Sequence, residues 1–224
     1  MRIFTILFLF LSMSILAQGD AINNMNTSAT YKNLRTNSSG MWVTSKPLDK
    51  TIQGTPYLFS SWEGSFLISS MEGNQYKLFN LNYNLLTKKL ETVMGKDSVF
   101  QYDISKIDYV KNFNRKYKVI NNELYQELIL GEKISLLKGF HVAVIDGVIS
   151  PLTQQYTTPN RYVQKSKYFY LKGEKFLEIK LKKKDVLSAF GDKAEQIKIY
   201  AKENKLSFGE ETDVMTMFRH YNTL

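Results

Sequence analysis

The sequence predicts an α+β fold, in which an antiparallel β-meander (an open barrel or a curved sheet) is followed by two or three short C-terminal helices. Short apolar and aromatic runs recur at roughly ten-residue spacing from Tyr57 onward, separated by turn residues. Aromatic residues make up 13% of the chain, which favours strands. After Leu181 the apolar period becomes helical. Strands followed by helices are typical of α+β proteins.

The 224 residues divide by composition into four segments. Residues 1–17 combine Arg2, an apolar run and small residues at the exit, as in a secretory signal peptide. The run is shorter than the roughly 20 apolar residues that span a membrane. Residues 18–50 are rich in Asn, Ser and Thr and predict a flexible leader with a short strand at 41–44. Residues 51–181 form the predicted β-rich domain, and residues 182–224 a helical segment packed on its sheet.

Within the β-rich domain, residues 76–86 show the clearest strand pattern, because apolar residues alternate with asparagines. We expect Asn82 to face solvent and the alternate side chains to face the core: Phe79, Leu81, Tyr83 and Leu85. Gly131-Glu132 and residues 172–174 predict hairpin turns. Residues 148–160 contain two prolines and predict a long polar loop. Further strands are predicted at 66–68, 90–94, 99–102, 107–110, 117–120, 124–130, 134–137, 140–145, 162–171 and 176–181.

Three helices are predicted after Leu181. The second begins with Asp192 as its N-cap and Glu195 three residues later, which is a capping-box pattern. Thr212 is the predicted cap of the third. Because short helices are marginal alone, we expect them to dock on the sheet. The docking side chains are predicted to be Val186, Leu187, Ile197, Tyr200, Phe208 and Phe218.

The charge of the chain is basic, with a formal net charge of +9, and the surplus lies mainly in residues 161–205. The densest block is Lys182, Lys183 and Lys184. We interpret these lysines as a candidate contact with an anionic envelope component, or otherwise as a solvated, solubilising surface. Export argues against nucleic acid as a natural partner. The chain has no cysteine, which excludes disulfides, a lipid anchor on cysteine and thiolate metal sites.

A search for chemistry finds no recognisable catalytic pattern. The two histidines are His141, within a strand pattern, and His220, near a helix C-terminus where a cation suits the helix dipole. The acids Glu210, Glu211 and Asp213 suit the start of the last helix for the same reason. The sequence contains no His-Glu-x-x-His, no Gly-x-Ser-x-Gly and no glycine-rich phosphate loop. We therefore predict no enzymatic activity, no cofactor and no metal.

Several segments taken together resemble a family of small secreted proteins of unassigned function from Bacteroidota. They are Gly54-Thr55-Pro56-Tyr57-Leu58, residues 162–170, and the tail segments 182–187, 197–208 and 221–222. The signal peptide ending in Leu16-Ala17-Gln18 is also typical of that group. The resemblance covers about residues 54–224 and implies an envelope location. It implies no activity and no site residues.

The sequence thus predicts an exported, non-enzymatic envelope protein with a binding or scaffolding role, located in the periplasm or outside the cell. Two alternatives stay open: a carrier whose meander closes around a small apolar ligand, as up-and-down barrels do, and a hydrolase of unfamiliar type. The expected partner is an anionic envelope component or another envelope protein. The mature chain is not expected to be transmembrane.

Overall fold

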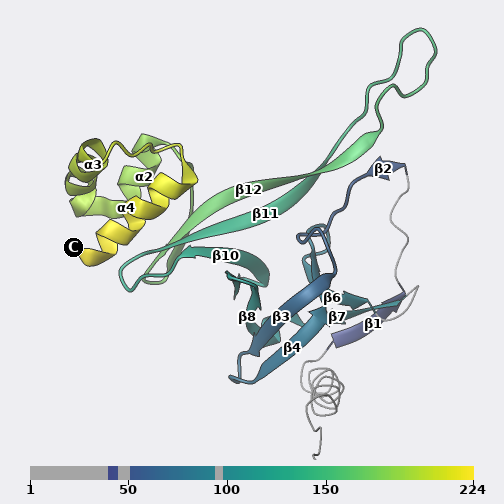
Figure 1. The fold of residues 1–224 in the computed structure, drawn as a ribbon, viewed down its shortest axis with the longest axis horizontal. Coiled ribbons are helices and arrows are strands. Elements are labelled where there is room, and N and C mark those ends of the chain that lie inside the picture. Colours follow the sequence, from purple (N-terminus) through teal and green to yellow (C-terminus); the bar gives the residue numbers. More distant parts are fainter. Residues whose placement is uncertain (1–39, 45–50, 94–97) are drawn as a thin grey trace, which may run out of the picture.

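The computed structural model describes residues 40–44, 51–93 and 98–224, and confirms the predicted α+β fold (Figure 1). Two antiparallel sheets precede three α-helices in this part of the chain. The predicted signal peptide and most of the predicted leader lie outside the described residues. Within the described ranges, no helix is both long enough and apolar enough to cross a membrane.

The large sheet contains the predicted meander, because its last six strands along the chain are neighbours in sequence order. Its two end strands, β4 and β13, do not pair with each other, so the sheet is open. The short strand β2 (Ile52–Gln53) adds a parallel pair beside β12. The order of the main strands is β13 (Lys175–Ile179), β12 (Asn160–Lys172), β11 (Ser135–Ile145), β10 (Glu123–Ile129), β9 (Arg115–Ile120), β8 (Ile107–Asn112), β3 (Glu63–Ser70) and β4 (Gln75–Asn80).

A small second sheet departs from the single predicted meander. Its order is β1 (Gly40–Thr44), β7 (Ser98–Tyr102), β6 (Lys89–Val93) and β5 (Asn82–Asn84), and a 3₁₀ turn, η1 (Ile104–Lys106), follows β7. The predicted strand at 41–44 is confirmed as β1. Strands β5, β6 and β7 follow β4 in the chain but pair with one another and with β1, so they belong to this second sheet and not to the large one.

The predicted continuous strand over 76–86 is wrong, because it breaks at Leu81 between β4 and β5. Leu78 is buried before the break, so Phe79 points outward and is 42% exposed. Leu81 and Tyr83 are buried as predicted, but Asn82 is buried too, with 1% exposure. A one-residue break in a strand moves every later side chain to the opposite face. The predicted alternation of buried and exposed side chains is therefore wrong at Phe79 before the break and at Asn82 after it.

Strand β11 joins two runs that the sequence analysis kept apart. Gly139 lies inside it and is buried. A Cβ at Gly139 would lie 2.9 Å from the rings of Tyr125 and Phe169. Glycine inside a strand often marks such a close approach. Here it lets two aromatic rings cross the strand without interrupting it.

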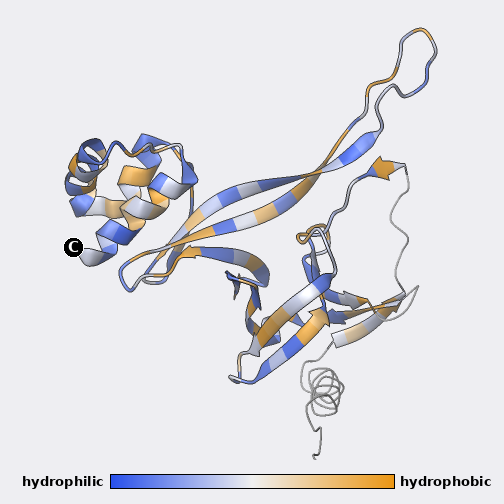
Figure 2. Cartoon of the chain, in the orientation of Figure 1, coloured by the Kyte–Doolittle hydropathy of each residue, from blue (hydrophilic) through white to orange (hydrophobic). Residues whose placement is uncertain are grey.

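The helices α2 (Lys183–Phe190), α3 (Ala194–Glu203) and α4 (Glu211–Thr223) form a second core with the sheet, and their apolar sides face one another (Figure 2). The predicted docking is confirmed: Val186, Ile197 and Phe218 are fully buried against residues of β10, β11 and β13. Leu187 and Phe208 pack partly buried against the same core. The remaining predicted docking residue, Tyr200, stacks on His220 with ring centroids 3.7 Å apart.

Both predicted helix caps are wrong. Asp192 lies inside a 3₁₀ turn, η2 (Gly191–Lys193), and the cap of α3 is Lys193 without a side-chain hydrogen bond. Helix α4 is capped by Glu210, so Thr212 already lies in its first turn. Asn222 near the other end of α4 ties it to the sheet, since its Oδ1 accepts from the backbone N–H groups of Lys133 and Ile134, both at 3.1 Å. Tertiary contacts rather than local caps hold these helices.

Candidate functional site

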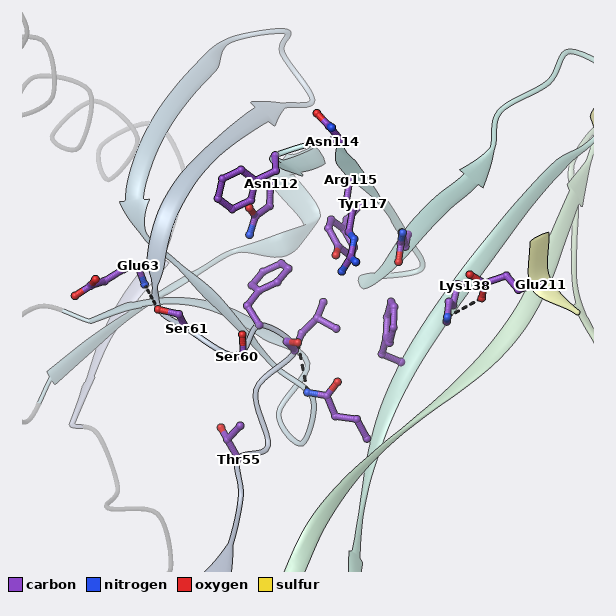
Figure 3. A pocket seen from close by; sticks show the side chains of 16 residues that line it. Thr55, Ser60, Ser61, Glu63, Asn112, Asn114, Arg115, Tyr117, Lys138 and Glu211 are labelled. Carbon is purple, nitrogen blue, oxygen red and sulfur yellow. Dashed lines mark hydrogen bonds and ion pairs between the residues drawn. The ribbon is translucent and has the colours of Figure 1, made fainter. Parts of the chain in front are cut away.

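A cleft of about 740 Å³ lies between residues 55–63 and the large sheet, with Glu211 of the last helix at one end (Figure 3). Its lining residues come from residues 54–62 (the cleft loop), strand β3, the turn between β8 and β9, strands β9, β10, β11 and β12, and the start of α4. Polar side chains alternate with aromatic ones around the wall. This size falls in the range of small-molecule sites, about 300–1,000 Å³.

The floor of the cleft is aromatic. The ring of Phe59 meets that of Tyr117 edge to face, with centroids 5.4 Å apart, and tilts against Phe66 at 5.3 Å. Phe140 lies beside Tyr117 at 6.5 Å. Burial raises the pKa of Tyr117, while a hydrogen bond from Arg115 and its positive charge act in the opposite direction. The aromatic rings of the floor therefore pack on the main core on one side and line the cleft on the other.

The cleft loop is held in place by buried polar side chains. Asn82 binds both backbone groups of Phe59: its Nδ2 donates to the carbonyl at 2.9 Å, and its Oδ1 accepts from the N–H at 3.0 Å. Tyr57 donates to the buried carboxylate of Glu91 at 2.8 Å, and burial together with Glu91 raises the pKa of Tyr57. Gln164 of β12 donates to the carbonyl of Tyr57. Both sheets thus position the loop.

The rim of the cleft is a two-residue turn, Phe113-Asn114, between β8 and β9. Phe113 has φ of 50° and is 76% exposed. The first position of such a turn is normally glycine, and a left-handed conformation costs an ordinary residue about 1–2 kcal/mol. Beside it, the buried Oδ1 of Asn112 has no hydrogen-bond partner among the described residues. The turn therefore places Phe113, with its strained backbone and exposed ring, next to the unsatisfied Oδ1 of Asn112.

One end of the cleft is an internally neutral cluster. The carboxylate of Glu211 accepts hydrogen bonds from Nζ of Lys138 at 2.6 Å and from the hydroxyl of Tyr168 at 2.7 Å. Burial raises the pKa of Glu211, but these two hydrogen bonds and the charge of Lys138 outweigh it, so the pKa is lowered overall. Burial and the Glu211 contact raise the pKa of Tyr168 to about 12. The charges of Lys138 and Glu211 neutralise each other, so this cluster offers little net charge to a ligand.

Arg115 is the second cation of the cleft lining beside Lys138; the lining also holds the carboxylates Glu63 and Glu211, and the charge of Arg115 contributes to the lowered pKa of Glu211. Arg115 lines the cleft at the end of the rim turn. Within the described ranges, no carboxylate lies within ion-pair distance of it. A guanidinium group in this state is suited to bind a carboxylate or phosphate through two parallel hydrogen bonds. The cleft can therefore attract an anionic group to the side of the rim turn.

The residues singled out by sequence lie elsewhere. Lys182, Lys183 and Lys184 are exposed at the start of α2, and none of them lines the cleft. His141 lines a smaller groove of about 340 Å³ with Glu123, which pairs with Lys88 at 3.3 Å. In the part of the chain that the structure describes, no group of three or more His, Cys, Asp or Glu residues could hold a metal ion.

Sequence reasoning missed the cleft because its lining residues are spread from Thr55 to Glu211. Its one local signal is an aromatic residue in the tight turn Asn112-Phe113-Asn114-Arg115, where glycine is usual. In comparisons with known proteins, no family model, curated protein or solved structure matches this chain. The proposals below therefore depend on the geometry of the site.

Proposed function

We propose that the protein is an exported, non-enzymatic binding protein of the cell envelope that holds an acidic oligosaccharide in its cleft. The signal-peptide pattern of residues 1–17 supports export. The observation that carries the proposal is the rim turn, which places the cation Arg115 two residues from Phe113, whose backbone has a positive φ and whose ring is exposed. Strained residues cluster at ligand-binding sites, where binding offsets their cost.

The ligand class follows from the lining chemistry. Sugar rings have apolar C–H faces and hydroxyl edges, so they suit a wall that combines aromatic rings with amide and hydroxyl groups. The cleft offers the rings of Phe59, Phe113 and Phe140 beside several amide and hydroxyl side chains, including Ser60, Asn114, Gln126 and Gln164. Arg115 adds the preference for a carboxylate or sulfate on the sugar. An apolar ligand leaves these polar groups unsatisfied, so the apolar-carrier alternative is less well supported.

Binding is better supported than hydrolysis. Glycosidases need a pair of carboxyl groups beside the scissile bond, one of them with a raised pKa that acts as the acid. The carboxyl group of Glu211 has a lowered pKa and is engaged by Lys138 and Tyr168. Glu63, the other carboxylate of the lining, lies on the opposite side of the cleft (Figure 3). This arrangement favours a static binding role.

The proposal is tested by calorimetric titration with tetragalacturonate as the acidic probe and maltotetraose as the neutral probe. We expect the acidic probe to bind and Arg115→Gln to weaken it by about tenfold or more, the effect of losing a charged hydrogen bond. Lys111→Gln is the matched control, since Lys111 is exposed on the same hairpin and does not line the cleft. Absence of binding, or equal weakening by both variants, would count against the proposal.

A further inference from the structure

The outer halves of β11 and β12 form a two-stranded extension, residues 140–166, which we call the arm (Figure 1). β10 pairs with β11 only as far as Gly139, and β13 pairs with β12 only from Tyr168 onward. Beyond these residues the two strands pair with each other and, at Asn160 and Arg161, with the two-residue β2, while the base of the arm contacts the body through Val142, which packs on the core, and Gln164, which binds the cleft loop. Isolated two-stranded ribbons are marginally stable in water. We therefore expect the outer part of the arm to be stabilised by a contact with another surface.

The tip of the arm, residues 147–159, is mostly exposed and carries several apolar side chains, next to the exposed Asp146 at its base. Leu152 in its turn is 93% exposed, and Val148 and Tyr156 are each 60% exposed. From Gly147 to Asn160 the sequence contains no charged residue and no histidine, although charged residues make up 23% of the chain. The predicted long loop at 148–160 is confirmed, and most of its residues are polar but uncharged, with the exposed apolar side chains set among them. Exposed apolar patches of this kind mark contacts with proteins or membranes.

The backbone of the tip satisfies many of its polar groups internally. Ser150 and Gln155 are joined by a backbone hydrogen bond of 2.8 Å, and the N–H of Thr157 donates to the carbonyl of Val148 at 2.7 Å. Side chains cap further N–H groups: Asn160 accepts from Gly147 at 2.8 Å, and Thr158 accepts from Val148 at 2.9 Å. Unsatisfied backbone groups are what makes loops costly in lipid. Because several of its backbone N–H and C=O groups are hydrogen-bonded within the tip, this tip would expose fewer unsatisfied groups to lipid than an irregular loop.

The side chains along the arm follow the layers of a bilayer surface. Leu152 lies at the turn, Tyr156 comes next, and the exposed cations Arg161 and Lys165 follow along β12. Tyrosine is enriched at the interface between hydrocarbon and headgroups. Arg161 follows Tyr156 by five residues, about 16 Å of extended chain. With a headgroup layer of about 5–8 Å, it stays within about one Debye length, 8–10 Å, of anionic lipid.

We propose that the arm docks the protein on an anionic lipid bilayer, with Leu152 in the acyl region, Tyr156 at the interface, and Arg161 facing the headgroups. A protein partner is the weaker candidate, because protein interfaces are rimmed by polar and charged groups, and the tip has no charge to meet them. Hydrocarbon, in contrast, excludes charge. The contact is made by the tip, whose residues do not line the cleft, although Phe140 and Gln164 at the base of the arm do.

The test is sedimentation of the purified protein with vesicles of phosphatidylglycerol and phosphatidylethanolamine, compared with vesicles of phosphatidylcholine. We expect binding to the anionic vesicles that Leu152→Asp weakens by about 10–100-fold, the effect of withdrawing one buried leucine from an apolar phase. Arg161→Gln should weaken it by about fivefold, whereas Lys165→Gln should have a smaller effect, because Lys165 follows Tyr156 by nine residues, about 30 Å of extended chain. Leu130→Asp is the matched control, because Leu130 is also exposed, at 69%, but lies in the β10–β11 turn.

A second measurement reports insertion directly. Because the chain has no cysteine, Leu152→Cys and Leu130→Cys each give a single site for an environment-sensitive fluorophore. We expect a blue shift on anionic vesicles for the label at position 152 only. The proposal is overturned if neither vesicle binds, if Leu152→Asp binds like wild type, or if the label stays in water. Loss of binding in the combined Lys182→Gln, Lys183→Gln and Lys184→Gln variant, with Leu152→Asp unaffected, would assign the contact to those lysines instead.

Discussion

Replacing Asn82 by alanine should destabilise the protein about as much as truncating a core leucine. The side chain is 1% exposed and takes part in three hydrogen bonds, two with the backbone of Phe59 and one from the N–H of Tyr83 at 2.9 Å. Each bond contributes about 1 kcal/mol net, and a buried group left without its partner costs about 1–3 kcal/mol. We therefore expect the free energy of unfolding to fall by about 3 kcal/mol.

Urea unfolding measures this effect. With an m value of about 2 kcal/mol/M, the midpoint should fall by about 1.5 M. Leu81→Ala, at a fully buried site, should cost about 2–5 kcal/mol. Asn74→Ala is the control, because Asn74 is exposed and such changes stay within about 0.5 kcal/mol. If Asn82→Ala unfolds at the same urea concentration as Asn74→Ala, then Asn82 faces solvent and the strand break at Leu81 is wrong.

Four further predictions address export, the rim, the cluster and the basic surface. Exported protein should begin between Gln18 and Ile22 by N-terminal sequencing; an intact Met1 outside the cytoplasm would contradict the signal peptide. Phe113→Gly should change stability by less than about 1 kcal/mol, because relief of strain offsets the lost contact, yet weaken tetragalacturonate binding. The pKa of Glu211 is lowered in the folded state, so the ionised carboxylate stabilises the protein above pH 4.5, and this stabilisation is lost as the pH falls below 4.5. The thermal midpoints of wild type and Glu211→Gln should therefore converge in acid. A difference that does not change with pH would contradict this prediction. The combined Lys182→Gln, Lys183→Gln and Lys184→Gln variant should elute from heparin at lower salt than wild type; unchanged elution would leave these lysines as solubilising surface.

Local turn chemistry explains which parts of the fold could be predicted from sequence. The predicted turn at residues 172–174 is confirmed, with β12 ending at Lys172, β13 beginning at Lys175, and Gly173 at a φ of 58°. The helices were found because their apolar residues recur with a helical period, and that face is buried. These signals lie within a few residues of one another in the chain.

The rest of the fold depends on contacts between distant residues. The period-two pattern of residues 76–86 carries no mark of the break at Leu81, whose N–H donates to the carbonyl of Trp62 at 3.2 Å. Nor does the pattern show that Asn82 binds the cleft loop. The cleft itself exists only once that loop, the rim turn and α4 come together. Local periodicity alone could not have located it.

Both proposed sites coincide with places where the chain departs from its own local rules. Phe113 occupies a turn position where glycine is relaxed, and Leu152 is almost fully exposed in a stretch without charged residues. Departures of this kind, when nothing nearby in the fold compensates for them, are expected at functional positions. The core of the fold obeys the rules, since its apolar side chains are buried and its glycines relieve close contacts. Positive φ angles also occur at Lys88, Gln154 and Lys205, but Phe113 combines one with an exposed aromatic ring on the rim of the cleft. Phe113 and Leu152 therefore mark the surfaces where we expect a ligand and a bilayer to supply further contacts.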